Sequence, residues 1–95
     1  MVTPIVGMAR GKAARRYQVR FDRNWLTGRW GFTDRVFYDL GGRELEPKRI
    51  SNTWVVQYRG TPGELGRLLS QMLNIQAADH QRFGAIFEIS EISNE

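Results

Sequence analysis

The chain has 95 residues, of which 41% are hydrophobic and 25% are charged, and it contains no cysteine. These values are typical of one small globular domain, and they exclude disulfides and thiolate chemistry. We expect a cytoplasmic protein, because the absence of cysteine fits a reducing compartment. No apolar run is long enough to span a membrane, and residues 1–7 lack the basic start of a signal peptide. Met1 and Met8 both remain open as the native start.

The net charge of +4 is concentrated at the N-terminal end of the chain. Residues 1–23 carry six basic side chains against Asp22 alone, six minus one or +5, whereas the rest has eight basic and nine acidic side chains, or −1. A basic cluster of this kind neutralises phosphates and favours nucleic-acid binding; the alternative is a solvated arm that keeps the protein soluble. The candidate nucleic-acid-binding residues are Arg10, Lys12, Arg15, Arg16, Arg20, Arg23 and Arg59.

Residues 1–15 are predicted to form a flexible basic arm, and residues 16–92 a single domain. The domain begins with a strand predicted from Arg16 to Asp22, in which Tyr17, Val19 and Phe21 alternate with polar residues. The apolar side of this strand is expected to face the core, and its polar side to face solvent.

Residues 33–46 allow two interpretations. A short helix could begin at Thr33 or Asp34, run to Leu40 and stop at Gly41. Alternatively, residues 36–40 could form a strand that turns at residues 41–42 into a hairpin. We favour the helix. Residues 43–50 are polar and contain a proline, so a strand there would be an edge strand or a broken one.

The clearest pattern lies in residues 52–74. Trp54, Val56 and Tyr58 share one face of a predicted strand, which should pack into the core. Thr61 and Glu64 have the spacing of a capping box, with Pro62 at the first helical position. An apolar helix stripe follows, and Asn74 is a candidate helix stop; the stripe consists of Leu65, Leu68, Leu69, Met72 and Leu73.

The chain is predicted to end with a loop and a strand. Residues 75–80 are interpreted as a loop. The last strand is predicted over residues 82–90, with Phe83, Ala85, Phe87 and Ile89 on one face and Gly84, Ile86, Glu88 and Ser90 on the other.

The order strand, helix, strand, strand, helix, strand predicts an α+β protein with the ferredoxin-like (βαββαβ) plan, in which two helices cover one face of an antiparallel sheet. The uncovered face would mix polar, charged and apolar side chains, and it would suit self-association or a ligand platform. Its expected members are Arg16, Gln18, Arg20, Asp22, Val55, Gln57, Arg59, Ile86, Glu88 and Ser90.

Catalytic candidates are few. His80 lies beside Asp79, but a solvated loop histidine is the commoner case. Asp22 ends the first strand, and two chains could each supply one such carboxylate to a shared Mg²⁺ or Mn²⁺ ion. The preferred alternative is that Asp22 pairs with Arg20, Arg23 or Arg59, or caps the following loop.

Several short signatures together resemble a known family. They are Val19-Arg-Phe-Asp22, Leu40-Gly41, Asn52-Thr-Trp-Val-Val56 and the capped leucine helix that follows. Their order over residues 16–90 resembles the ferredoxin-like superfamily of the CRISPR adaptation scaffold proteins and virulence-associated protein D. The resemblance implies a homodimer and, as in several members, a metal-dependent endonuclease acting on RNA or DNA. By position, Asp22 corresponds to the family's carboxylate, so the resemblance implies that Asp22 is catalytic and binds the metal.

The chain also departs from this family. Some fifteen residues precede the first strand, and the predicted first helix is shorter and less charged than usual. We therefore expect a small basic homodimeric nucleic-acid-associated protein, either a metal-dependent endoribonuclease or endonuclease or an inactive scaffold relative. The rival hypothesis is a non-enzymatic protein-binding regulator of phage or mobile-element origin.

Overall fold

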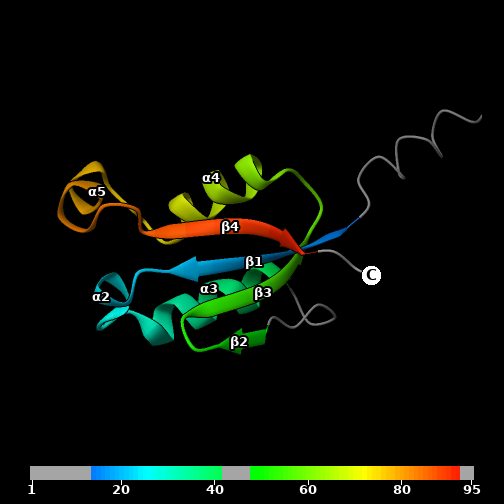
Figure 1. Ribbon diagram of the computed structural model, residues 1–95, viewed down its shortest axis with the longest axis horizontal. Helices are drawn as coiled ribbons and strands as arrows, with labels where there is room; N and C mark the ends of the chain where they lie inside the picture. The colour runs from blue at the N-terminus through cyan, green and yellow to red at the C-terminus, as the bar shows by residue number, and fades with distance from the viewer. Residues whose placement is uncertain (1–13, 42–47, 93–95) are drawn as a thin grey trace, which may run out of the picture.

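The computed structural model describes residues 14–41 and 48–92, and the predictions made for residues 1–13, 42–47 and 93–95 lie outside it. The described residues form an α+β fold of four strands and four helices (Figure 1). In chain order these are β1 (Arg15–Phe21), α2 (Arg23–Leu26), α3 (Trp30–Gly41), β2 (Lys48–Ile50), β3 (Thr53–Tyr58), α4 (Pro62–Met72), α5 (Ala77–Phe83) and β4 (Phe87–Ile92). None of the helices in these ranges is long and apolar enough to cross a membrane.

The four strands form one sheet in the order β2-β3-β1-β4, and all neighbouring strands are antiparallel. At the centre of β1, Gln18 lies opposite Val55 of β3 and Ser90 of β4. The two edges are the three-residue strand β2 and the six-residue strand β4. For residues 48–50, the described part of the segment 43–50, the prediction of at most an edge strand is confirmed.

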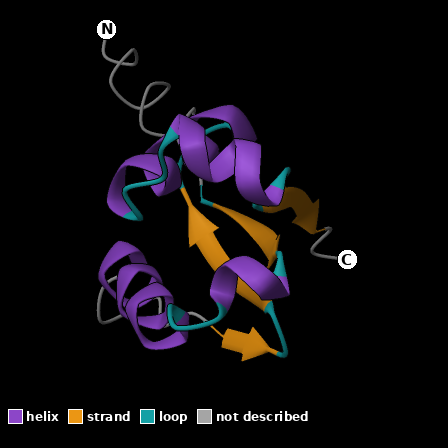
Figure 2. Ribbon diagram, turned by 90° about the vertical axis from the view of Figure 1, so that its left-hand side faces the viewer, coloured by secondary structure: helices purple, strands orange, loops and turns teal. Residues whose placement is uncertain are grey.

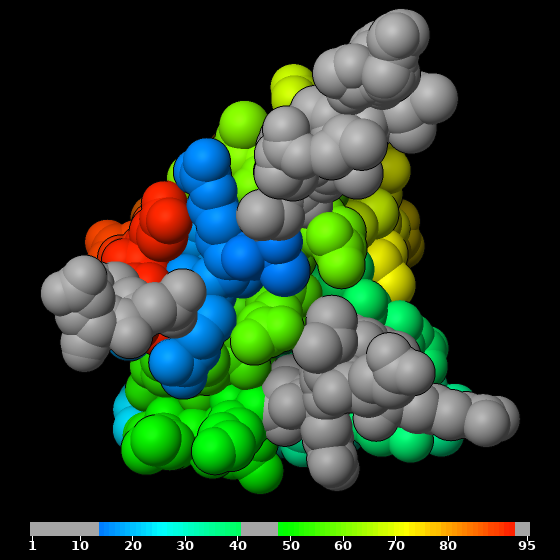
Figure 3. Space-filling view, turned by 90° about the vertical axis from the view of Figure 1, so that its right-hand side faces the viewer, coloured from blue at the N-terminus to red at the C-terminus, as the bar shows by residue number. Residues whose placement is uncertain are grey.

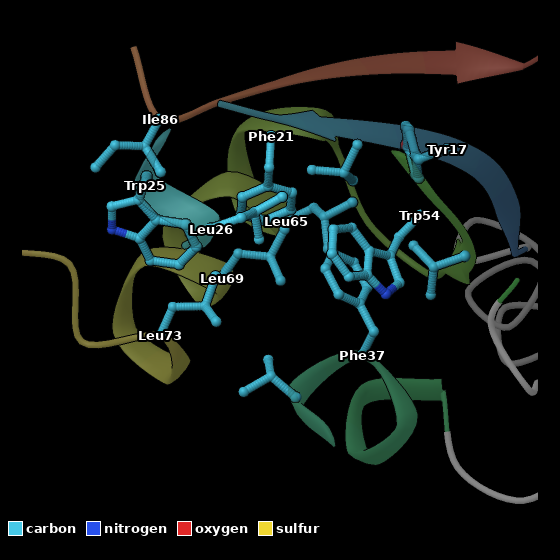
Figure 4. Packing of buried hydrophobic residues seen from close by; sticks show 13 residues of the cluster. Tyr17, Phe21, Trp25, Leu26, Phe37, Trp54, Leu65, Leu69, Leu73 and Ile86 are labelled. Carbon is cyan, nitrogen blue, oxygen red and sulfur yellow. The ribbon is translucent and has the colours of Figure 1, made fainter. Parts of the chain in front are cut away.

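Two helices pack against one face of the sheet, α3 beside β3 and α4 beside β4, whereas α2 and α5 lie at one end of the sheet (Figures 1 and 2). The core lies between these layers, where β1 and β3 direct their apolar side chains (Figure 4). As predicted, Tyr17, Val19 and Phe21 are buried on β1, and Trp54 and Val56 are buried on β3.

Phe21 stands at the centre of this core. Its ring lies 5.5 Å from Trp25, 5.9 Å from Phe37, 5.2 Å from Trp54 and 5.3 Å from Phe87. Trp54 in turn stacks on Phe37, with ring centroids 5.2 Å apart. Each such pair adds roughly 0.5–1.5 kcal/mol beyond the area that it buries, so the aromatic cluster ties β1 and β3 to α2 and α3.

Helix α4 begins as its sequence predicts. Thr61 Oγ1 accepts from the Glu64 amide at 3.1 Å, and Glu64 Oε1 accepts from the Thr61 amide at 2.9 Å, which completes a capping box. Leu65 and Leu69 are fully buried on its inner side. Asn74 follows the helix with a φ of 56°, a left-handed conformation that asparagine tolerates and that stops the helix.

The preference for a helix after residue 33 is also confirmed, although α3 begins earlier, at Trp30. Thr33 is not its cap. The Thr33 side chain is fully buried, and its hydroxyl donates to the Arg29 carbonyl at 2.7 Å. This bond runs to the residue four positions back, as in a helix interior.

Two predictions for the C-terminal part are wrong. Part of the predicted loop 75–80 belongs to α5, whose first turn is held by Asp79 Oδ2 accepting from the Gln76 amide at 2.8 Å. The helix ends at Gly84, whose φ of 76° suits glycine, so β4 begins only at Phe87. Ile86 therefore does not lie on an open face: it is 1% exposed, and its carbonyl accepts from the Asp22 amide at 2.8 Å.

Candidate nucleic-acid interface

The sheet has one face that none of the described helices covers, which we call the open sheet face. The cross-strand register places its members on one side, because directly opposed residues of antiparallel strands point the same way. They are Arg16, Gln18 and Arg20 of β1, Lys48 and Ile50 of β2, Thr53, Val55 and Gln57 of β3, and Glu88, Ser90 and Ile92 of β4. All of these side chains are exposed or half-buried.

The charge on the open sheet face is positive. Arg16, Arg20 and Lys48 stand against Glu88, so the net charge is three minus one, or +2. Four residues along a strand span about 13 Å, and two strand spacings span about 10 Å. The three cations are therefore spread over a patch wide enough to reach separate phosphates.

Arg20 is partly engaged by its neighbour. Its Nη2 lies 2.5 Å from Glu88 Oε1, and the two side chains are 61% and 65% exposed. Exposed ion pairs of this kind contribute only about 0–1 kcal/mol. A phosphate could therefore displace Glu88 from Arg20 at small cost.

The structure separates the other predicted basic residues. Arg15 lies within β1 with its side chain on the helix side, 3.7 Å from Glu91. Arg59 directly follows β3, at the end of the sheet where β1 begins. At that end β1 lies between β4 and β3 (Figure 3). Arg23 belongs to α2 at the other end and donates to Ser51 Oγ. Arg10 and Lys12 lie outside the described residues.

Besides Thr53 and Ile92, the sequence analysis missed two members of the open sheet face that lie on one strand, Lys48 and Ile50. They come from β2, whose three residues are all exposed, and Ile50 is 73% exposed. Their alternation with Arg49 was visible in the sequence. However, only the pairing of Lys48 with Val55 and of Ile50 with Thr53 reveals which of them joins the face.

Asp22 was predicted to end β1 on the open sheet face, and this prediction is wrong. The strand stops at Phe21, and Asp22 caps α2: its Oδ2 accepts from the Trp25 amide at 2.9 Å. Its own amide donates to Ile86, which fixes it at the junction of β1 and β4. The alternative that Asp22 caps the following segment is the one that these contacts support.

The surroundings of Asp22 do not fit a magnesium or manganese site within one chain. Asp22 and Glu88 line a hollow of about 170 Å³, and Arg20 lines it too. Glu88 already binds Arg20, and one oxygen of Asp22 already accepts an amide. Mg²⁺ requires about six oxygen ligands, and the described residues contain no group of three or more His, Cys, Asp or Glu side chains placed to hold a metal.

His80 lies in α5 rather than in a loop, and it is exposed. Its Nδ1 lies 3.4 Å from the Gly84 carbonyl at the end of the same helix. This contact at the end of α5 is sufficient to account for the position of His80.

Comparison of the chain with protein-family models, with curated proteins and with solved structures gives no match. The resemblance to the scaffold-protein superfamily therefore stays a hypothesis carried by the short sequence signatures.

Proposed function

We propose that this protein binds nucleic acid through its open sheet face, on a ferredoxin-like fold. The fold proposal is supported by the strand order, since β3 separates β1 from β2 and β1 separates β3 from β4, the split arrangement of two βαβ units. Helices α2 and α5 are additions to that plan.

One observation carries the proposed function: Arg16, Arg20 and Lys48 share one uncovered face on which Glu88 is the sole carboxylate among the members defined above. Phosphates are the natural ligands of cations spread in this way. The face carries no aromatic side chain among those members, so bases have no ring to stack on. We therefore expect backbone contacts with little sequence preference and a strong dependence on salt.

The test is the salt dependence of binding. Labelled single-stranded and duplex oligonucleotides would be titrated at several salt concentrations against the native protein and against Arg16→Gln/Arg20→Gln/Lys48→Gln. The slope of log affinity against log salt should fall by about 0.7–0.9 for each cation that no longer binds a phosphate. The matched control is Arg67→Gln/Arg82→Gln, which removes exposed cations from α4 and α5. An equal loss of slope per cation removed in both variants would mean that only net charge matters, and would overturn the assignment to the open sheet face.

We also propose self-association, with the open sheet face as its site; because a dimer would bury Arg16, Arg20 and Lys48, self-association should compete with nucleic-acid binding. A small domain gains from burying an uncovered face, and Val55 lies at the centre of this one. Sedimentation at micromolar concentration should give a dimer that Val55→Glu weakens and that Gln71→Glu, on the exposed side of α4, does not. A monomer at all concentrations would exclude self-association, and with it a metal site shared by the Asp22 side chains of two chains.

A second candidate function is the binding of another protein. The observation that favours it is Ile50, which is 73% exposed and lies opposite Thr53 and diagonal to Val55 on the same face. An isolated exposed isoleucine is common, whereas an apolar patch often marks an interface. If the triple variant binds oligonucleotides as well as the native protein does, this candidate replaces the first.

Cleavage of RNA or DNA through Asp22, with Mg²⁺ or Mn²⁺, stays a prediction. Asparagine caps helices about as well as aspartate, so Asp22→Asn removes the charge and keeps the cap. Metal-dependent cleavage by the native protein should disappear in Asp22→Asn. Cleavage that persists there, or that no divalent metal elicits, leaves binding without catalysis.

A further inference from the structure

A groove runs between α3 and the edge formed by β2 and β3, on the helix side of the sheet. Its volume of about 620 Å³ lies within the range of small-molecule sites. The residues of its lining that matter here are Asp34, Arg35, Tyr38 and Asp39 of α3, Arg49 of β2 and Trp54 of β3. The open sheet face lies on the other side of β2, since Arg49 points away from Lys48 and Ile50.

The Arg49 guanidinium is fixed before any ligand arrives. Its Nε donates to Asp34 Oδ1 at 3.1 Å, and its Nη1 donates to the Ser51 carbonyl at 3.2 Å. Its central carbon lies 5.3 Å from the ring centre of Trp30 and 5.7 Å from that of Trp54. Arg49 nevertheless stays 40% exposed. A donor already held in place loses little entropy when it binds a ligand.

Asp34 completes this arrangement, because its Oδ1 also accepts from the indole nitrogen of Trp54 at 2.8 Å. One carboxylate thus holds the arginine against the two tryptophans, and its charge is matched by Arg49. The groove is therefore lined on this side by a guanidinium held in place by Asp34 and by the indole ring of Trp54.

Helix α3 lines the groove with an exposed aromatic ring and two further charged side chains. Tyr38 is 50% exposed, which leaves a large aromatic ring available for stacking. Arg35 and Asp39 flank it and are also exposed. An aromatic ring, a cation and a carboxylate on one wall match a planar heterocycle that carries both hydrogen-bond donors and a negative group.

We propose that this groove binds a nucleotide. Tyr38 stacks on the base, Asp39 accepts from its N–H groups, and Arg35 and Arg49 bind the phosphate. This site does not depend on nucleic-acid binding by the open sheet face, because its ligand is a single nucleotide and its residues are different.

The probes are AMP, GMP, CMP and UMP, and the readout is the indole N–H resonances of the three tryptophans. Trp54 lines the groove, and Trp30 contacts Arg49, which lines it too. Trp25 lies at the opposite end of the core from Trp54 (Figure 4). Addition of at least one nucleotide should shift the resonances of Trp30 and Trp54 in a saturable way and leave that of Trp25 in place. Shifts that inorganic phosphate alone reproduces would reduce the site to weak anion binding and overturn the proposal, as would the absence of any shift at millimolar nucleotide.

Variants assign the contacts. Tyr38→Ala should weaken binding about fivefold or more, the value of one base stacked on an aromatic ring, whereas Tyr38→Phe keeps the ring and should bind normally. Arg35→Gln should also weaken binding, and Arg67→Gln on α4 serves as its matched control. Because Tyr38 and Arg35 are exposed, these variants should fold, which the unchanged Trp25 resonance would verify. Equal affinity of Tyr38→Ala and the native protein would overturn the proposal.

The same titrations separate this proposal from the preceding one. Arg16→Gln/Arg20→Gln/Lys48→Gln should lose affinity for oligonucleotides and bind the mononucleotide normally. If no mononucleotide binds, the proposal for the open sheet face still stands. If the oligonucleotide test gives a negative result, the proposal for the groove still stands.

Discussion

The two faces of the sheet differ sharply although the same strands make both. On β1, Tyr17, Val19 and Phe21 are at most 1% exposed, whereas Gln18 and Arg20 between them are exposed. The helix side binds the layers together through stacked rings, and the open side carries charges that the fold does not need. Substitutions on the helix side should therefore change stability, and substitutions on the open side should change binding.

The largest effect is expected at Trp54. Trp54→Ala should lower the free energy of unfolding by about 3–5 kcal/mol, because it leaves a large cavity and removes the indole that Asp34 accepts from. Its neighbour Val55 points to the open side, so Val55→Ala should cost about 0.5 kcal/mol. Urea denaturation of both variants measures the contrast, and similar costs would mean that the faces are not energetically distinct.

Asp22 offers a test at the boundary between the two faces. Asp22→Ala should cost about 1 kcal/mol, since the Trp25 amide loses its acceptor. Asp22→Asn should cost only a few tenths of a kcal/mol, because asparagine keeps the cap. Thermal unfolding followed by circular dichroism compares the two. If both variants are equally destabilised, the charge of Asp22, rather than its capping bond, supports the fold.

A similar effect is expected where α4 begins. Thr61→Ala should lower the free energy of unfolding by about 1 kcal/mol through loss of the bond to the Glu64 amide. Thr61→Ser keeps the hydroxyl and is the matched control. Chemical denaturation would contradict the capping role if the two variants were equally stable.

The smallest change in stability is expected on the open sheet face. Glu88→Gln removes an exposed ion pair with Arg20 and should alter the free energy of unfolding by less than about 0.5 kcal/mol. It also raises the positive charge of the face, so affinity for oligonucleotides should increase at low salt. Weaker binding by Glu88→Gln would indicate that Glu88, and not the cations, contacts the partner.

Local patterns accounted for much of the fold. The alternation in Tyr17–Phe21 and in Trp54–Tyr58 places side chains on two sides of a strand whatever the strand pairs with. The capping box at Thr61 closes within four residues, and Asn74 ends the helix by its own conformational tolerance. These features depend on neighbours in the chain, and each of them was predicted correctly.

The remaining features depended on residues far apart in the sequence. Ile86 is buried because β4 begins late and lies beside β1, and Asp22 became a cap because the strand stops one residue earlier. The pairing of β2 with β3 places Lys48 on the open sheet face and Arg49 in the groove. Periodicity alone determines that side chains alternate. Which side is covered, and which distant side chains share it, is decided by the register and order of the strands, which form only when the whole sheet assembles.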